Sequence, residues 1–290
     1  MPTASSSRTP AAARALPILA VALLGCHTSR PAPLTAPRHD ASTTLGSGPP
    51  LVYLVLGDST AAGVGADYEQ GIALGTARHL ARSRRVEVVN LAVSGARFRD
   101  VLAEQLPRAR AIKPDLVLLD VGANDVTHLT SSRSVGRELE EILRLISTAN
   151  CEARIVVTGA PDMGSPPRIP FFLRGIAALK ARGINRIARR AVAAHELTFA
   201  PIAERTGPAF RRDRTLFASD RFHPNARGYA LWTAVLEEAL DTALATQPGH
   251  CGAPAAPRAT AVHALRDQPD GVMVESFEGN RTRWRLGGPA

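Results

Sequence analysis

The chain has 290 residues, of which 45% are hydrophobic and only 4% aromatic, so aliphatic side chains must build its core. That length suits one α/β domain of about 200 residues with extensions. The formal net charge of +9 comes almost entirely from arginine, because Lys113 and Lys180 are the only lysines. The sequence contains no dense basic run with interleaved aromatic residues. The composition therefore does not support nucleic-acid binding, and we expect no nucleic-acid partner.

Residues 1–26 have the pattern of an export signal. Arg8 and Arg14 precede an apolar run at residues 15–24, which leads to Cys26. A basic start, a short apolar core and small residues are typical of a secretory signal, and the run is shorter than the roughly 20 residues that span a bilayer. The end of the segment resembles the bacterial lipobox, in which the cysteine is lipidated and becomes the new N-terminus. The alternative is a plain signal peptide with an incidental cysteine. In both cases we expect an extracytoplasmic protein, either membrane-anchored through Cys26 or secreted.

The composition changes twice after the signal. Residues 27–50 are rich in Pro, Ser, Thr and Gly and have no apolar period, which predicts a disordered tether. Apolar runs and amphipathic stretches then alternate over residues 51–246, which predicts the folded domain. Residues 247–290 show no clear period and are too few to form a core of their own, so we expect a C-terminal extension.

The alternating segments of the domain predict a doubly wound α/β sandwich. Continuous apolar runs predict buried parallel strands at residues 51–56, 86–91, 116–121, 155–158 and 197–200. Helices are predicted at residues 71–82, 134–149 and 225–245, and another is marked by Phe172, Ile176, Leu179 and Ile187. We expect the apolar stripes of these helices to face the core.

Three motifs follow predicted strands and could supply a nucleophile and an oxyanion hole. Gly57 permits a sharp turn that exposes Ser59 after the first strand. Gly95 follows the second strand, and Asn124, a neutral amide donor, follows the third. Open α/β sheets place their sites at this edge, so we expect the three motifs to lie together. Taken singly, each also has a structural explanation: a capping serine, a loop glycine and an Asx turn.

A fourth motif, residues 220–224, precedes the last predicted helix and contains Asp220 and His223. An aspartate and a histidine three residues apart can meet through a tight turn. The carboxylate then orients one ring nitrogen, and the other can accept a proton from a serine. A surface loop with a solvated histidine is the alternative for this segment on its own.

Together and in this order, the four segments resemble the conserved blocks of the SGNH hydrolase superfamily, also called GDSL esterases and lipases. The resemblance covers about residues 51–246, and residues 57–66, 160–164 and 223–232 are similar to a bacterial branch of esterases and lysophospholipases. Thr60 stands where the name motif has leucine, a departure that occurs within the superfamily. The resemblance implies a flavodoxin-like three-layer α/β/α sandwich with a central parallel sheet of about five strands.

The resemblance also implies a serine esterase or acylhydrolase that works through an acyl-enzyme intermediate. In that mechanism Ser59 is the nucleophile, His223 the general base and Asp220 the acid that orients it. The implied oxyanion hole consists of the backbone N–H groups of Ser59 and Gly95 with the side-chain amide of Asn124.

The sequence leaves the identity of the ester open. We expect a short-chain acyl ester or a lysophospholipid; the alternatives are a carbohydrate O-acetyl esterase and a non-catalytic lipoprotein binding module on a hydrolase scaffold. An ordinary α/β-hydrolase is disfavoured, because Ala61 occupies the last glycine position of its Gly-x-Ser-x-Gly elbow. We expect no cofactor and no metal, since no Gly-rich phosphate loop occurs and His79, His128 and His195 are isolated in the sequence.

The three cysteines, Cys26, Cys151 and Cys251, are an odd number for an exported chain. If Cys26 is lipidated, Cys151 and Cys251 remain and can form a disulfide. Two unrelated buried thiols are the alternative, because spacing alone does not place them within bonding reach.

Overall fold

The computed structural model describes residues 42–109 and 111–246. Both ranges belong to the first of the two units of the chain, residues 1–251. The predicted signal, Cys26, Cys251 and the predicted extension lie outside the described residues. No helix within the two described ranges is long and apolar enough to cross a bilayer.

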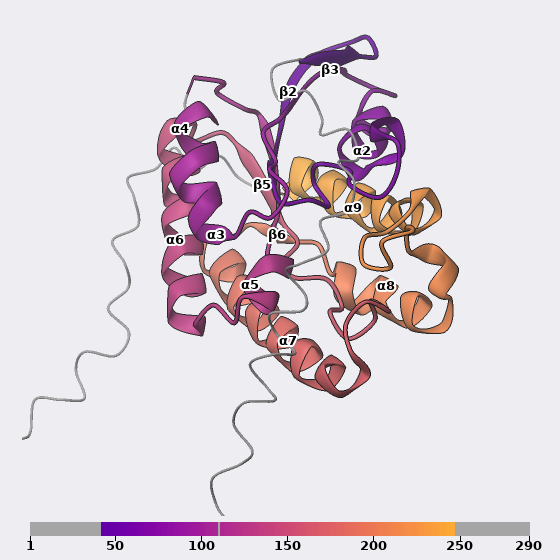
Figure 1. Cartoon of the computed structure of the whole chain (residues 1–290). Coiled ribbons are helices and arrows are strands. Elements are labelled where there is room, and N and C mark those ends of the chain that lie inside the picture. The colour runs from indigo at the N-terminus through magenta and orange to yellow at the C-terminus, as the bar shows by residue number, and fades with distance from the viewer. Residues whose placement is uncertain (1–41, 110, 247–290) are drawn as a thin grey trace, which may run out of the picture. The chain divides into compact units, whose positions relative to one another are not determined.

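A six-stranded mixed sheet in the order β1-β3-β2-β4-β5-β6 forms the centre of the fold (Figure 1). Strands β2 to β6 run parallel, whereas β1 pairs antiparallel with β3 at one edge. The order of the parallel strands is that of flavodoxin-like folds, so the predicted α/β sandwich with about five parallel strands is confirmed. The strands are β1 Thr43–Leu45, β2 Pro50–Gly57, β3 Arg85–Asn90, β4 Leu116–Asp120, β5 Arg154–Val157 and β6 Thr198–Phe199.

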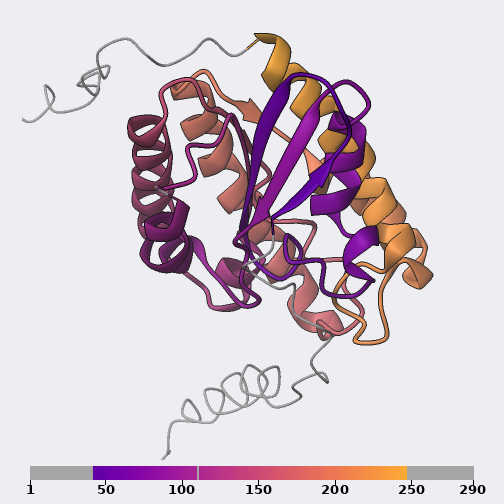
Figure 2. The ribbon, with the colours of Figure 1, turned by 90° about the horizontal axis from the view of Figure 1, so that it is seen from above.

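Helices cover both faces of this sheet (Figure 2). Side chains of β2 alternate between two core clusters, with Tyr53 and Val55 in one and Leu54 and Leu56 in the other. The first cluster joins the sheet to α2, α8 and α9, and the second joins it to α3, α4, α6 and α7. The helices are α2 Ile72–Leu80, α3 Phe98–Asp100, α4 Leu106–Ala109, α5 Ala123–Thr127, α6 Ser132–Ala149, α7 Phe171–Ala194, α8 Ile202–Arg212 and α9 Ala226–Thr246.

Helix α6 shows how the sequence specifies these layers. Its buried residues, Val135, Leu139, Ile142 and Ile146, recur at helical spacing and form one apolar stripe toward the sheet. The hydroxyl of Ser131 caps the helix by accepting a hydrogen bond from the N–H of Ser134 at 3.1 Å. The apolar stripe and the cap indicate the same helix, and the sequence predicted α6 almost to its ends.

Strand β1 corrects the predicted tether. Thr43 to Leu45 lie within residues 27–50 but pair with β3, from Thr43 opposite Val88 to Leu45 opposite Val86. Leu45 also packs against the first core cluster. Three residues are too few to show a strand period, so only the exposed edge of β3 selects this conformation. The folded domain therefore begins before residue 51.

The expected core stripe of α7 was wrong for three of its four residues, since only Ile187 packs against the second core cluster. Phe172, Ile176 and Leu179 are 54%, 57% and 67% exposed. The stripe that faces the core is displaced by about one position from the predicted one. It consists largely of small side chains, which let the helix lie close to its neighbours. Its members are Leu173, Ala177, Ala181, Ile184 and Ala188. A search for large apolar residues at helical spacing selects the wrong face here, because both faces of the first three turns are apolar.

Three helical segments were not predicted. They are α5, α8 and the region that runs from α3 to α4. In α8, the buried residues Ile202, Thr206 and Phe210 recur every fourth position, but Pro208 inside the helix is unfavourable for a helix and conceals the pattern. A π-helix, Val101–Gln105, joins α3 to α4 and places Gln105 beside Gly57 at the end of β2.

Candidate active site

The turn after β2 holds Ser59 at the carboxyl edge of the sheet. Gly57 has a φ of +148°, and a Cβ there would lie 2.0 Å from the carbonyl oxygen of Asp120, so only glycine fits. The side-chain amide of Gln105 accepts a hydrogen bond from the N–H of Gly57 at 2.9 Å and donates one to its carbonyl at 2.8 Å. Sequence reasoning missed Gln105, because no local pattern connects it to a glycine 48 positions away.

The four sequence-predicted segments do come together at this edge. The Oγ of Ser59 lies 2.8 Å from Nε2 of His223, and Nδ1 of His223 lies 2.5 Å from Oδ2 of Asp220. Ser59 is only 5% exposed and His223 9% exposed, so the contact is shielded from bulk water. Serine, histidine and aspartate thus form one continuous hydrogen-bonded row.

Asp220 is held by its own loop. Its Oδ1 accepts hydrogen bonds from the backbone N–H groups of Phe222 and His223, both at 3.0 Å, while Arg221 adopts a φ of +60° in the turn. Burial alone would raise the pKa of Asp220. The hydrogen bond and charge of His223, together with the two backbone N–H groups, outweigh burial and lower the pKa to about 2. Asp220 is therefore a carboxylate at neutral pH.

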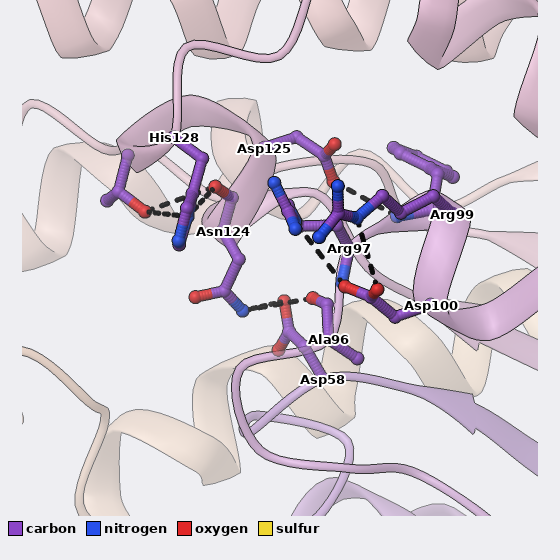
Figure 3. Close-up of polar contacts among 10 residues, drawn as sticks. Asp58, Ala96, Arg97, Arg99, Asp100, Asn124, Asp125 and His128 are labelled. Atoms are coloured by element: carbon purple, nitrogen blue, oxygen red, sulfur yellow. Dashed lines mark hydrogen bonds and ion pairs between the residues drawn. The ribbon is translucent and has the colours of Figure 1, made fainter. Parts of the chain in front are cut away.

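The expected oxyanion donors lie on the neighbouring loops. Asn124, in α5, donates through Nδ2 to the carbonyl of Ala96 at 3.1 Å and lies 3.5 Å from Oδ2 of Asp58 (Figure 3). Gly95 has a φ of +89° and open space where a Cβ would project. Within residues 42–109 and 111–246, no protein acceptor is hydrogen-bonded to the backbone N–H of Ser59 or Gly95. The N–H groups of Ser59 and Gly95 are thus without a protein acceptor in the described part of the chain, and the Asn124 amide lies against Asp58, the residue before the serine.

Asp125 fastens the segment that contains Asn124 to the segment that follows Gly95. Its Oδ2 accepts a hydrogen bond from the N–H of Phe98 at 3.2 Å, which ties α5 to the start of α3 (Figure 3). Burial raises the pKa of Asp125. Asp125 and Gln105 are positioning residues that sequence reasoning did not single out.

A small open cleft lies against Ser59 and His223. It is bounded mainly by apolar side chains and by the loop that precedes α7. The lining includes Met163, Pro166, Phe210, Phe217, Phe222 and Trp232. The cleft can therefore receive an apolar group next to the serine hydroxyl.

The described residues contain no group of three or more His, Cys, Asp or Glu side chains that could hold a metal ion. Two histidines isolated in the sequence contact carboxylates instead: His79 lies 2.9 Å from Asp241, and His195 lies 2.7 Å from Glu140. His128 lies 2.8 Å from the carbonyl of Asn124.

Comparison with known proteins decides the family. The GDSL-like Lipase/Acylhydrolase family matches residues 55–231, more than half of the chain. The GDSL-like esterase Rv1075c of Mycobacterium tuberculosis is 31% identical over 224 residues, which are 72% of this chain and 70% of that protein. The chain belongs to the GDSL-like lipase/acylhydrolase family. It is therefore a carboxylic ester hydrolase.

Solved structures of GDSL hydrolases share the fold. A putative GDSL-like lipase from Parabacteroides merdae superposes with a TM-score of 0.58 at 19% identity, covering 68% of this chain and 98% of that one. Phospholipase A1 from Streptomyces albidoflavus superposes with a TM-score of 0.51 at 21% identity, covering 65% of this chain and 99% of that one. At these identities the likeness concerns the fold alone.

In this GDSL hydrolase, Thr60 occupies the leucine position of the motif and bridges two buried carboxyl groups. Its hydroxyl lies 2.9 Å from Oδ1 of Asp58 and 2.7 Å from Oδ2 of Asp120. A hydroxyl has one hydrogen and can donate to only one of them, so the second contact requires a proton on a carboxyl group. Burial and the charge of Asp120 raise the pKa of Asp58 to about 7, and burial also raises the pKa of Asp120. The pair therefore retains a proton well above the usual range of aspartate.

The cysteines of the hydrolase are only partly described. Cys151 is disulfide-bonded. Cys251, its predicted partner, and Cys26, the predicted lipidation site, lie outside the described residues. The pairing of Cys151 with Cys251 stays a prediction.

Proposed function

We propose that this GDSL hydrolase is a serine esterase in which Ser59, His223 and Asp220 act as a catalytic triad. One observation carries the proposal: the row of hydrogen bonds from Ser59 Oγ through His223 to Asp220. The Asp220 carboxylate accepts a hydrogen bond from Nδ1 of His223, so Nδ1 carries the hydrogen. The other ring nitrogen, Nε2, can then accept the serine proton.

The reaction then proceeds in two halves. Ser59 Oγ bonds to the ester carbonyl carbon while its proton moves to His223 Nε2. His223 returns the proton to the leaving alcohol as the ester C–O bond breaks, which leaves an acyl group on Ser59. Water gives a proton to His223 and attacks this acyl-enzyme, and the same proton returns to Ser59 Oγ as the acid is released.

The carbonyl oxygen gains negative charge in both halves, and three donors are suited to stabilise it. They are the backbone N–H groups of Ser59 and Gly95 and the amide of Asn124. One hydrogen of the Asn124 amide is committed to the carbonyl of Ala96, which fixes the amide plane. The other makes only a long contact with Asp58 and can donate to an oxyanion placed along its direction.

The lining of the cleft supports an acyl substrate. Phe217, Phe222 and Met163 offer apolar surface beside the nucleophile, and in the lining apolar side chains outnumber polar ones such as Asp162, Ser165 and Thr206. We therefore propose a short-chain acyl ester or a lysophospholipid as substrate. A panel of p-nitrophenyl esters of graded chain length, with a lysophospholipid and an acetylated xylan, tests this. A preference for the xylan would overturn the acyl-chain proposal.

A fluorophosphonate probe separates the esterase from a non-catalytic binding module, because only an activated serine reacts with it. We expect labelling of the wild type and of Ser147→Ala, a change on α6, and none of Ser59→Ala. An unlabelled wild-type protein would contradict the triad.

We also propose an extracytoplasmic location, with a lipid anchor on Cys26. The N-terminal signal pattern supports the proposal, as does the disulfide at Cys151, since disulfides persist in oxidising compartments. Incorporation of labelled fatty acid into the wild type but not into Cys26→Ser would support the anchor. Release of both proteins as unlipidated mature chains would exclude it.

A further inference from the structure

The N-terminal half of α7 exposes an apolar surface. Phe171, Phe172, Ile176 and Leu179 are 82%, 54%, 57% and 67% exposed. They are four of only six exposed large hydrophobic residues in the part of the chain that the structure describes. Scattered apolar residues are ordinary on a protein surface, but a contiguous group over three helical turns marks an interaction site.

A fifth member of this group lies on the loop after α5. Leu129 is 54% exposed and has a φ of +54°, a left-handed conformation that is unfavourable for leucine. The adjacent carbonyl of Thr130 accepts a hydrogen bond from Nζ of Lys180, so this loop is fastened to α7. Helices α5 and α7 also contact each other, as Figure 1 shows. We call these five residues, Leu129, Phe171, Phe172, Ile176 and Leu179, the α7 apolar face.

Positive charge continues the stripe toward the C-terminus of α7. The helix contains six lysine or arginine residues and no aspartate or glutamate. Arg182, Arg186 and Arg190 follow Ile176 and Leu179 at helical spacing and are exposed. Among the described residues, no carboxylate forms an ion pair with Arg186 or Arg190. An amphipathic surface that combines exposed aromatic and aliphatic residues with arginines is suited to an anionic lipid interface.

The α7 apolar face lies next to the cleft. The loop that leads into α7 carries Met163 and Pro166, which line the cleft beside Ser59. The same loop is tied to the triad loop, because the N–H of Arg168 donates to the carbonyl of Arg221 at 3.0 Å. Phe171 begins the helix three residues later. A surface that contacted the α7 apolar face would therefore lie close to the mouth of the cleft.

We propose that the α7 apolar face docks on an anionic phospholipid surface, with Phe171, Phe172, Ile176 and Leu179 entering the interface and Arg186 and Arg190 contacting the headgroups. The charge of the helix favours this partner, because its six lysine or arginine residues and its lack of carboxylates complement anionic headgroups. The inference concerns binding alone and holds whether or not Ser59 is the nucleophile.

Vesicle cosedimentation tests the proposal with the full chain. Every protein carries Cys26→Ser, so that no lipid anchor contributes. The parent should bind phosphatidylcholine vesicles that contain phosphatidylglycerol more tightly than pure phosphatidylcholine vesicles, and added salt should weaken the binding. Phe172→Ser with Leu179→Ser should lower the partition coefficient at least tenfold.

Two further variants complete the test. Leu231→Ser, which alters an exposed leucine on α9, is the matched control and should bind within twofold of the parent. Arg186→Gln with Arg190→Gln should remove most of the preference for phosphatidylglycerol. All variants should keep the parent circular dichroism spectrum and its activity on a soluble p-nitrophenyl ester.

Three results would overturn the proposal. One is equal partition of the parent and the Phe172→Ser, Leu179→Ser variant. Another is binding that is indifferent to phosphatidylglycerol. The third is a parent that ignores vesicles but forms a dimer in the ultracentrifuge that the double variant does not form, because the α7 apolar face would then bind a second copy.

Discussion

Ser59 Oγ lies 2.8 Å from His223 Nε2, although 164 positions separate the two residues in the chain. Ser59 follows β2, near the start of the domain, and His223 precedes α9, its last helix. The contact therefore exists only when both ends of the domain are in place. Local unfolding of either end should therefore separate the two groups.

Ser59→Ala should abolish esterase activity without unfolding the protein. Removal of the nucleophile of such a triad lowers kcat by roughly 10⁴-fold or more, because acyl transfer to the enzyme is lost. Steady-state kinetics on a p-nitrophenyl ester and circular dichroism measure the two quantities. Activity within tenfold of the wild type would rule out Ser59 as the nucleophile.

Asn124→Ala should lower kcat by about 10²–10³, the usual loss for one oxyanion donor, with little change in KM. The amide is expected to bind the oxyanion more strongly than the neutral carbonyl, so the transition state loses more than the ground state. Separate determination of kcat and KM checks this. A change confined to KM would assign Asn124 to substrate binding instead.

Thr60→Leu, which introduces the leucine of the family motif, should destabilise this particular protein. Asp58 and Asp120 would both lose the hydroxyl that lies between them in the core. An unsatisfied buried polar group costs about 1–3 kcal/mol, and we expect a loss of that size in the free energy of unfolding by urea. Thr60→Ser keeps the hydroxyl and is the control. Equal stability of Thr60→Leu and the wild type would show that the Thr60 hydroxyl contributes nothing to the free energy of unfolding.

Asp58 should make the protein less stable as the pH rises from about 4 to about 7. Its folded pKa of about 7 exceeds its ordinary value of 3.8, so in this window the folded state holds a proton that the unfolded state has released. One such proton lowers the free energy of unfolding by up to about 1.4 kcal/mol per pH unit, and the contribution is lost once the pH passes the folded pKa. Urea denaturation across this range should give a flatter profile for Asp58→Asn. Parallel profiles for the two proteins would mean that Asp58 is ionised throughout.

The sequence by itself determined the elements whose signals are local. The apolar runs at β2 and β4 are continuous because both faces of those strands are covered, and the stripe of α6 has an unbroken helical period. The motifs around Ser59, Asn124 and Asp220 were also recognisable, since each follows a strand or precedes a helix in a fixed order. Parallel strands bring their carboxyl ends to one edge, so this order predicted a shared site.

Only the tertiary structure decided which groups complete that site and which face of α7 remains exposed to solvent. Gln105 is hydrogen-bonded to Gly57, and Thr60 to Asp120, through contacts between segments far apart in the chain. Hydrogen bonds of this kind leave no period in the sequence, because they depend on where the ends of two elements meet. The orientation of α7 was predicted wrongly for a related reason. Large apolar residues and alanines form two adjacent stripes, and close packing against the sheet selects the smaller side chains.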